Sequence, residues 1–308
     1  MTRPLRAFAF AFAFALALAC ATATCVPSLG PGDSLITTTR ILAVRADPAE
    51  AAPGAMVTFT SFVASPGGTV TDAAIDWSFC TAPKPLTEDN VVSNACLDSS
   101  SLVAAGAGPT TMAATPGNGC SIFGPDVGSA GLRPRDPDGT GGYYQPLRAD
   151  LTGTGSVFEL ARIHCDLAAA DATAAAAFAA AYTLNLNPQL LPLTASLGGA
   201  STALTGIPAG AHVTLEASWP DASAETFAYF DPVAQAVTSQ RESMQVAWYS
   251  SGGALDTEST GRASDDTATT SDDGWTAPST GGTVHVWIVL RDSRGGVDFA
   301  GYDLVVGP

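Results

Sequence analysis

The sequence is poor in basic residues. It contains 13 Lys and Arg residues against 29 Asp and Glu, a formal net charge of −16, and Lys84 is its one lysine. Nucleic acids and anionic lipid surfaces attract clustered Lys and Arg, so both are poor partners for this chain. A catalytic or phosphate-binding lysine would have to be Lys84.

The motifs of several enzyme classes are also missing. The sequence has no HExxH, GxSxG, P-loop or Rossmann glycine pattern. Of its three histidines, His212 and His285 alternate with apolar neighbours, which predicts the polar face of a strand, and His164 is interpreted as structural. We therefore expect no enzyme. A Ser-His-Asp triad leaves no local signature, so a hydrolase with its site in residues 81–150 stays open as an alternative.

Long apolar runs are absent as well. Arg3 and Arg6 precede an uncharged run of Ala, Phe and Leu over residues 7–19. A membrane-spanning helix needs ~20 residues, whereas a short run behind a positive start is typical of an export signal. Ala17-Leu18-Ala19-Cys20 resembles the lipobox of bacterial lipoproteins. That resemblance implies a signal peptide over 1–19 and an acylated Cys20. Plain cleavage near Ala19 or Ala23 is the alternative.

Acylation would make the membrane the first partner of the protein, because each buried CH₂ of an acyl chain contributes ~0.8 kcal/mol. Ala21, not Asp, follows Cys20, which by the same resemblance implies the outer membrane, with a periplasmic or cell-surface location. Without residues 1–19 the chain keeps 11 basic and 29 acidic residues, a net charge of −18. Residues 20–38 lack periodicity and predict a flexible tether.

Turn-forming residues are abundant. Gly (31) and Pro (21) are common among the 308 residues and only 14% are charged, which favours short strands and many turns. Within 74–80, Ile75, Trp77 and Phe79 alternate with polar residues, so they predict the inner face of a strand. A tryptophan at such a position fills the core of immunoglobulin-like sandwiches.

The second half of the chain repeats the first. Residues 209–215 parallel 53–59, and residues 245–249 around Trp248 parallel 74–78. This repeat predicts one module over 39–166 and another over 185–308. The Ala-rich residues 167–184 predict a helical connector, with Asp166 or Asp171 as its cap and with Phe178 and Tyr182 docking it.

The C-terminal region carries a family resemblance. Trp275-Thr276-Ala277-Pro278 and residues 281–296 resemble the last two strands of bacterial Ig-like and PKD-like repeats, although Cys80 in the first module replaces a glycine of the PKD pattern. The layout, with its RILAVRADPAEAAPG opening at residues 40–54, resembles myxobacterial-type envelope lipoproteins. This resemblance implies a mainly β fold of two Ig-like β-sandwich modules joined by a short helix. It also implies a non-enzymatic role in binding, adhesion or structural display.

The cysteines suit an exported chain, in which disulfides persist. With Cys20 acylated and Cys25 unpaired in the tether, four cysteines remain and allow three pairings. We favour Cys80–Cys96 with Cys120–Cys165, because the first would close a short Pro-rich excursion beside a predicted strand. Cys-His metal binding is the rival interpretation, although no CxxC pair is present.

Residues 81–150 show no pattern of their own and predict a long disulfide-tied loop, either a decoration or the functional surface. Within it, Asp136, Asp138 and Thr140 alternate in an Asp/Gly-rich stretch and are candidate ligands for calcium. No glutamate completes an EF-hand, so a solvated turn is the alternative. No other cofactor is expected.

Aromatic residues are the remaining candidates for binding. Tyr143, Tyr144, Tyr249 and Trp287 could form a platform for a glycan. Trp287 shares a face of its predicted strand with His285 and Arg291, opposite to the Val, Ile and Leu face. Packing between the modules is the alternative role for Trp287.

Overall fold

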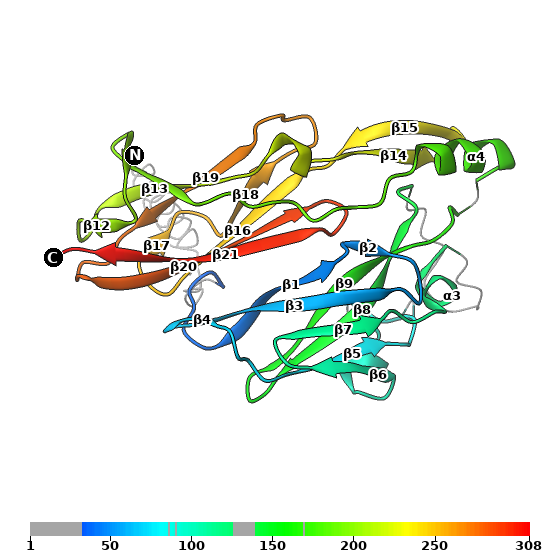
Figure 1. Ribbon diagram of the computed structural model, residues 1–308, viewed down its shortest axis with the longest axis horizontal. Helices are drawn as coiled ribbons and strands as arrows, with labels where there is room; N and C mark the ends of the chain where they lie inside the picture. Colours follow the sequence, from blue (N-terminus) through cyan, green and yellow to red (C-terminus); the bar gives the residue numbers. More distant parts are fainter. Residues whose placement is uncertain (1–32, 86, 90, 126–138, 169) are drawn as a thin grey trace, which may run out of the picture. The chain divides into compact units, whose positions relative to one another are not determined.

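The computed structural model describes residues 33–85, 87–89, 91–125, 139–168 and 170–308 (Figure 1). The predicted signal peptide, Cys20, Cys25, Asp136 and Asp138 lie outside the described residues. Within these ranges, no helix combines the length and the apolar character needed to cross a membrane.

The first module is built from two sheets. In the first sheet the long strand β3 pairs antiparallel with three neighbours; its strands are β1 (Arg40–Asp47), β3 (Met56–Ser65), β4 (Gly68–Val70) and β7 (Thr110–Ala114). The second sheet has five strands, in the order β2 (Glu50–Ala51), β9 (Gly155–His164), β8 (Gly142–Leu151), β5 (Ile75–Cys80) and β6 (Leu102–Ala107).

The core between these sheets follows the predicted alternation. Ile75, Trp77 and Phe79 of β5 are buried, whereas Asp76 between them is exposed. Phe59 of β3 meets Phe79 edge-on, with ring centroids 5.8 Å apart. The indole N–H of Trp77 donates to the carbonyl of Gly108 at 2.7 Å, so the one polar atom of this side chain is satisfied inside the core.

The second module has two five-stranded sheets. The first contains β11 (Ala200–Thr202), β10 (Thr194–Leu197), β13 (His212–Ser218), β19 (Thr270–Thr276) and β17 (Ala254–Leu255). The second contains β12 (Thr205–Ile207), β21 (Val297–Val306), β20 (Gly282–Asp292), β16 (Met244–Ser250) and β18 (Ser259–Arg262). Trp248 of β16 and Trp275 of β19 are fully buried between them. The mainly β prediction, with two sandwich modules and a core tryptophan in each, is confirmed.

A helix lies between the modules in sequence, and it packs against a hairpin that is inserted between β13 and β16 of the second module. Helix α4 (Ala172–Ala181) begins at Asp171, whose carboxylate accepts from the amide of Ala174 at 2.7 Å. Phe178 packs against the hairpin of β14 (Thr226–Asp231) and β15 (Ala236–Arg241), beside which α4 lies in Figure 1. The sequence did not predict this hairpin, nor the short 3₁₀ turn η1 (Asp221–Ser223) before it.

The prediction of an unpatterned loop over 81–150 is wrong for much of its length. The segment contributes β6, β7 and β8 and the short helices α2 (Asn94–Leu97) and α3 (Gly119–Phe123). Strands β6 and β7, LVAAGA and TTMAA, hold mostly small residues and therefore give little hydrophobic alternation.

Two disulfides join these pieces to the sheets. Cys80–Cys96 links β5 to α2, and Cys120–Cys165 links α3 to the residue after β9. These are the two pairings favoured from the sequence.

Candidate functional site

The two modules meet through strand β20, which is buried on both faces. Val286, Ile288 and Leu290 point into the core of the second module. Trp287 and Val289, on the opposite face, contact residues of the first module, in a cluster that includes Ile36, Leu42, Ala43, Phe62 and Ala64. We call this cluster the junction. It joins 33–308 into one body.

Directional contacts fix the register of the junction. The rings of Phe62 and Phe299 stack almost parallel, with centroids 4.4 Å apart and an interplanar angle of 6°. The guanidinium of Arg45 pairs with the carboxylate of Asp298 at 2.9 Å. Because these contacts depend on the relative position of the two sheets, they resist sliding as well as separation.

Trp287 serves the junction and is not exposed as a stacking platform. Its side chain is 1% exposed, and its indole N–H donates to the hydroxyl of Thr69 at 2.9 Å. His285 lies beside it, with ring centroids 6.0 Å apart, and pairs with Asp303 at 2.7 Å. Of the two predicted roles for Trp287, the structure supports inter-module packing.

The other aromatic candidates do not form an exposed platform either. Tyr143 is 1% exposed and packs with Ile163. Tyr144 is half-buried, and its hydroxyl donates to the carbonyl of Arg294 at 3.4 Å. Tyr249 is half-buried against the junction, on the side toward Arg40. The sequence placed Tyr249 on a strand correctly, whereas it placed Tyr143 and Tyr144 in the long loop, and the structure has both in strand β8.

A buried ion pair lies at the end of the first module. The guanidinium of Arg162 contacts the carboxylate of Glu50 at 3.1 Å, and neither side chain is exposed. Tyr182 donates its hydroxyl to Glu50, and the amide of Asn185 donates to it at 2.9 Å. Burial alone would raise the pKa of Glu50, but the contacts with His164, Arg162 and these donors outweigh it and lower the pKa to about 2.

A second buried cluster surrounds Arg294 in the other module. Its guanidinium pairs with Glu242 at 2.7 Å and with Glu225 at 2.8 Å, and lies 4.7 Å from the ring of Phe227. Burial, followed by repulsion from Asp292, raises the pKa of Glu242 to about 7 despite the neighbouring arginine.

The connector after α4 bonds to both clusters. The backbone amide of Asn185 donates to Glu50, and its side-chain amide donates to Asp292 at 3.4 Å. The carbonyl of Thr183 accepts from Arg294 at 3.1 Å. These ionisable groups therefore hold the modules and the connector together. The sequence did not predict these clusters, because the local sequence around a buried ionisable residue does not distinguish it from an exposed one.

The predicted calcium ligands are only partly described. Thr140 lies just before β8, and its hydroxyl and carbonyl accept from Arg162 at 3.0 and 3.2 Å. Among the residues with described positions, no group of three or more His, Cys, Asp or Glu side chains could hold a metal ion. The involvement of Asp136 and Asp138 stays a prediction.

The histidines do not converge. The exposed His212 lies 3.5 Å from Asp256, and His164 lies 3.7 Å from the buried Glu50. The ring centroids of His164 and Tyr182 are 4.3 Å apart.

The segment 81–150 lines two hollows of about 100 and 480 Å³. In the described part of the chain, their walls contain no histidine or carboxylate, and Lys84 is their one charged residue.

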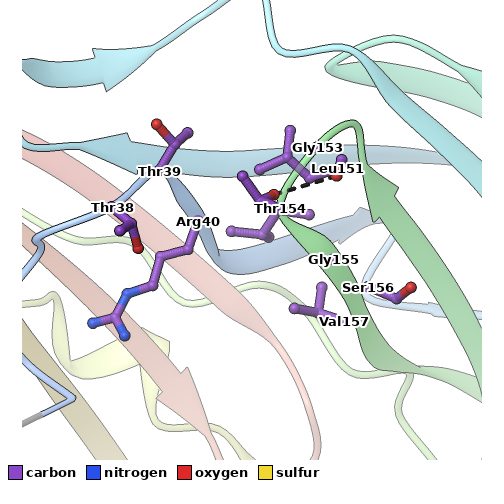
Figure 2. Close-up of a pocket in the computed structure, with 10 residues that line it drawn as sticks. Thr38, Thr39, Arg40, Leu151, Gly153, Thr154, Gly155, Ser156 and Val157 are labelled. Atoms are coloured by element: carbon purple, nitrogen blue, oxygen red, sulfur yellow. Dashed lines mark hydrogen bonds between the residues drawn. The ribbon is translucent and has the colours of Figure 1, made fainter.

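A separate cavity of about 390 Å³ lies where β1 begins (Figure 2). One wall is the chain from Thr38 to Ile41, and the other is Leu151 with the β8–β9 turn, residues 153–157. Figure 2 shows the Arg40 side chain running along one side of the cavity, with the turn opposite to it. Among the described residues Arg40 is the one charged side chain in this lining, and hydroxyl-bearing residues occupy much of the rest.

No protein-family model matches the chain, and no curated protein is found as a relative. Among solved structures it is similar to the D0-D1 domain of intimin, at 11% identity and a TM-score of 0.24, over 87% of this chain and 99% of that one. The Yersinia pseudotuberculosis adhesin InvE matches at 13% identity and a TM-score of 0.24, over 91% and 62% of the two chains. The C-terminal domain of the Streptococcus agalactiae AgI/II polypeptide BspA matches at 9% identity and a TM-score of 0.24, over 88% and 99%.

Proposed function

We propose that this protein is a non-enzymatic, lipid-anchored component of the bacterial outer envelope that presents a rigid two-module body for binding, adhesion or structural display. The observation that carries the proposal is the junction. Trp287 and Val289 are fully enclosed between the modules, and Arg45–Asp298 crosses the boundary. Rigidly joined sandwiches suit display, because a ligand surface then keeps a fixed position relative to the anchor.

The anchor is argued from the sequence. Cys20 follows a short apolar run and a lipobox-like Ala17-Leu18-Ala19, and the residues after it are predicted to form a tether between a membrane and the fold. The prediction that this tether extends to residue 38 is wrong, because Ile36 is buried in the junction and its amide donates to the carbonyl of Ser250. The acidic composition argues against nucleic acid as a partner, and the proposed location makes an envelope protein or a glycan the expected partner.

The buried ionisable groups support a structural role better than a catalytic one. Glu50 and Arg162 neutralise each other, and Arg294 is shared between Glu242 and Glu225. Groups engaged in this way orient the connector and the module ends. The hydrolase alternative needs Asp, His and Ser converging in a deep pocket, whereas the hollows lined by 81–150 contain none of the three histidines.

Glycan binding is the second candidate, and the cavity beside Arg40 favours it. Its size falls within the ~300–1,000 Å³ typical of small-ligand sites. Its lining combines one cation with Thr38, Thr39, Thr154 and Ser156. The hydroxyls can hydrogen-bond to those of a sugar, and the apolar side chains of Ile41, Leu151 and Val157 in the same lining can contact a sugar ring.

Intact-mass analysis of the full chain from native membranes, with a thiol count, tests the anchor. We expect a mass increase at Cys20 equal to acylation, one free thiol at Cys25 and two disulfides. A Cys20→Ser variant is the matched control and should leave the membrane fraction. An unacylated chain cleaved near Ala23 would overturn the lipid-anchored proposal.

A further inference from the structure

We propose that the cavity between the start of β1 and the β8–β9 turn binds a carboxylate group, carried by an acidic sugar or a peptide, through the guanidinium of Arg40. This inference deepens the proposed binding function and rests on it. The first ground is the charge of the lining. Among the described residues that line the cavity, Arg40 is the one with a charge, although the chain contains 29 Asp and Glu residues. A negatively charged ligand bound in the cavity would therefore meet a cation and no carboxylate of this lining.

The second ground is the state of the Arg40 guanidinium. Its Nε and Nη2 atoms are both buried and have no hydrogen-bond partner. The N–H groups of these two atoms form one edge of the guanidinium and point in parallel, which matches the two oxygens of a carboxylate. Buried donors without acceptors are unfavourable, so an acceptor in the cavity would gain two charge-assisted hydrogen bonds.

Arg40 is the one arginine of the described residues whose guanidinium has no hydrogen-bond or ion-pair acceptor, although Nη1 of Arg162 is also buried without a partner. Six of them form ion pairs with carboxylates: Arg45, Arg148, Arg162, Arg241, Arg262 and Arg294. Arg291 donates to the carbonyl of Leu42 at 3.3 Å. The fold therefore supplies an acceptor to each of these cations and leaves Arg40 without one.

The position of Arg40 suits a ligand contact. Its guanidinium carbon lies 5.6 Å from the centre of the Tyr249 ring, which holds the cation against the second module while its side chain lines the cavity. Turning the Nε–Nη2 edge toward the cavity would break no hydrogen bond of these atoms, because neither makes one. The side chains of Thr38 and Thr39 lie on the same wall and offer hydroxyls to the remainder of a ligand.

The chemistry favours a carboxylate over a sulfate or phosphate. One guanidinium edge satisfies the two oxygens of a carboxylate, whereas a dianion leaves oxygens and charge uncompensated. The net charge of the whole chain, −16, also repels a dianion more strongly than a monoanion.

The test uses the full chain, exported by a bacterial host and extracted from its envelope in detergent. Binding of four probes is measured by titration calorimetry and ligand-observed NMR: glucuronate, N-acetyl-alanine, the methyl ester of glucuronate and sulfate. We expect one of the two carboxylates to bind, the ester and sulfate to bind at least tenfold more weakly, and Arg40→Gln to weaken carboxylate binding at least tenfold. Lys84→Gln removes the same charge far from the cavity and should bind as the wild type does.

The probes separate the two sources of the carboxylate. Binding of glucuronate alone assigns an acidic sugar, and binding of N-acetyl-alanine alone assigns a peptide terminus. If Arg40→Gln does not fold, as judged by circular dichroism, Arg40→Lys is used, since it keeps the charge but loses the two-atom edge and should still bind several-fold more weakly.

Three results would overturn the inference: no carboxylate binding by the wild type, unchanged binding by the Arg40 variant, or equal binding of sulfate. The intact mass of the same preparation distinguishes the two proposals. An unacylated chain that binds glucuronate contradicts only the anchor, and an acylated chain that binds no carboxylate contradicts only the site at Arg40.

Discussion

The indole N–H of Trp287 in one module donates to the hydroxyl of Thr69 in the other at 2.9 Å, across 218 positions of sequence. This bond satisfies the polar atom of a side chain that is otherwise enclosed by apolar residues of both modules. The two sandwiches are therefore coupled by a directional contact as well as by apolar area.

Replacing Trp287 with alanine should uncouple the modules. Removing a buried tryptophan costs ~3–5 kcal/mol through lost burial and the cavity that remains. We expect calorimetry to show one unfolding transition for the wild type and two for Trp287→Ala, because each module keeps its own core. Thr69→Val removes only the hydrogen bond and should cost ~1 kcal/mol without splitting the transition. A single, unshifted transition in Trp287→Ala would show that the junction contributes little.

Glu50→Gln should destabilise the protein by ~3–5 kcal/mol at pH 7, because it leaves the buried guanidinium of Arg162 without its counter-charge. Chemical denaturation measures this difference. Arg45→Gln is the control, since its ion pair with Asp298 is partly exposed and such pairs contribute ~0–1 kcal/mol. Equal losses in the two variants would contradict the structural role assigned to Glu50.

Glu50 should also make the stability of the protein depend on pH. The pKa of Glu50 is lowered to about 2 from an ordinary value of 4.5, so its stabilising contribution is complete above pH 4.5 and is lost as the pH falls toward 2. We expect the stability gap between wild type and Glu50→Gln to narrow across that window. A gap that stays constant from pH 5 to pH 2.5 would contradict the lowered pKa.

Glu242 should act in the opposite direction. Its pKa is raised from 4.5 to about 7, so the folded protein favours the protonated carboxyl. The contribution of Glu242 to the free energy of unfolding therefore declines as the pH rises from 4.5 to 7. Glu242→Gln mimics the protonated side chain and should remove this decline. Unfolding free energies at half-unit pH steps measure the effect, with Glu216→Gln as a control on a strand of the second module. Parallel profiles for wild type and Glu242→Gln would refute the prediction.

The two disulfides should differ in their contributions. Cys120–Cys165 closes 45 residues of chain and Cys80–Cys96 closes 16. Loop-closure entropy then predicts losses of ~4 and ~3 kcal/mol for the paired alanine variants. Denaturation of the two double variants tests the order, and a larger loss for Cys80→Ala/Cys96→Ala would contradict it.

The sequence predicted the elements whose side chains alternate in size and polarity. Trp77 and Trp248 each sit among large apolar residues, so their strands were visible. Strands β6 and β7 were not, because alanine, glycine and threonine carry little contrast between faces. The β14–β15 hairpin was missed although Phe227 and Phe230 are buried in it, since its second strand is polar.

The candidate sites were harder to predict for a different reason. Trp287 and Tyr143 were identified as unusual, but whether a ring is exposed depends on strands far away in sequence. Arg40 looks like any arginine at the start of a strand, and only the positions of Tyr249 and the β8–β9 turn reveal its unsatisfied edge. Such features arise from tertiary packing and leave no local pattern.

The entry of the chain into the fold has a mechanical consequence. The amide of Ile36 donates to the carbonyl of Ser250 at 2.8 Å, and the amide of Ser250 donates to the carbonyl of Ser34 at 2.9 Å. A tensile force applied at residue 33 is therefore first opposed by strand β16 of the second module, before it can reach β1 of the first. The module that comes later in the sequence is the one that would bear such a pull first.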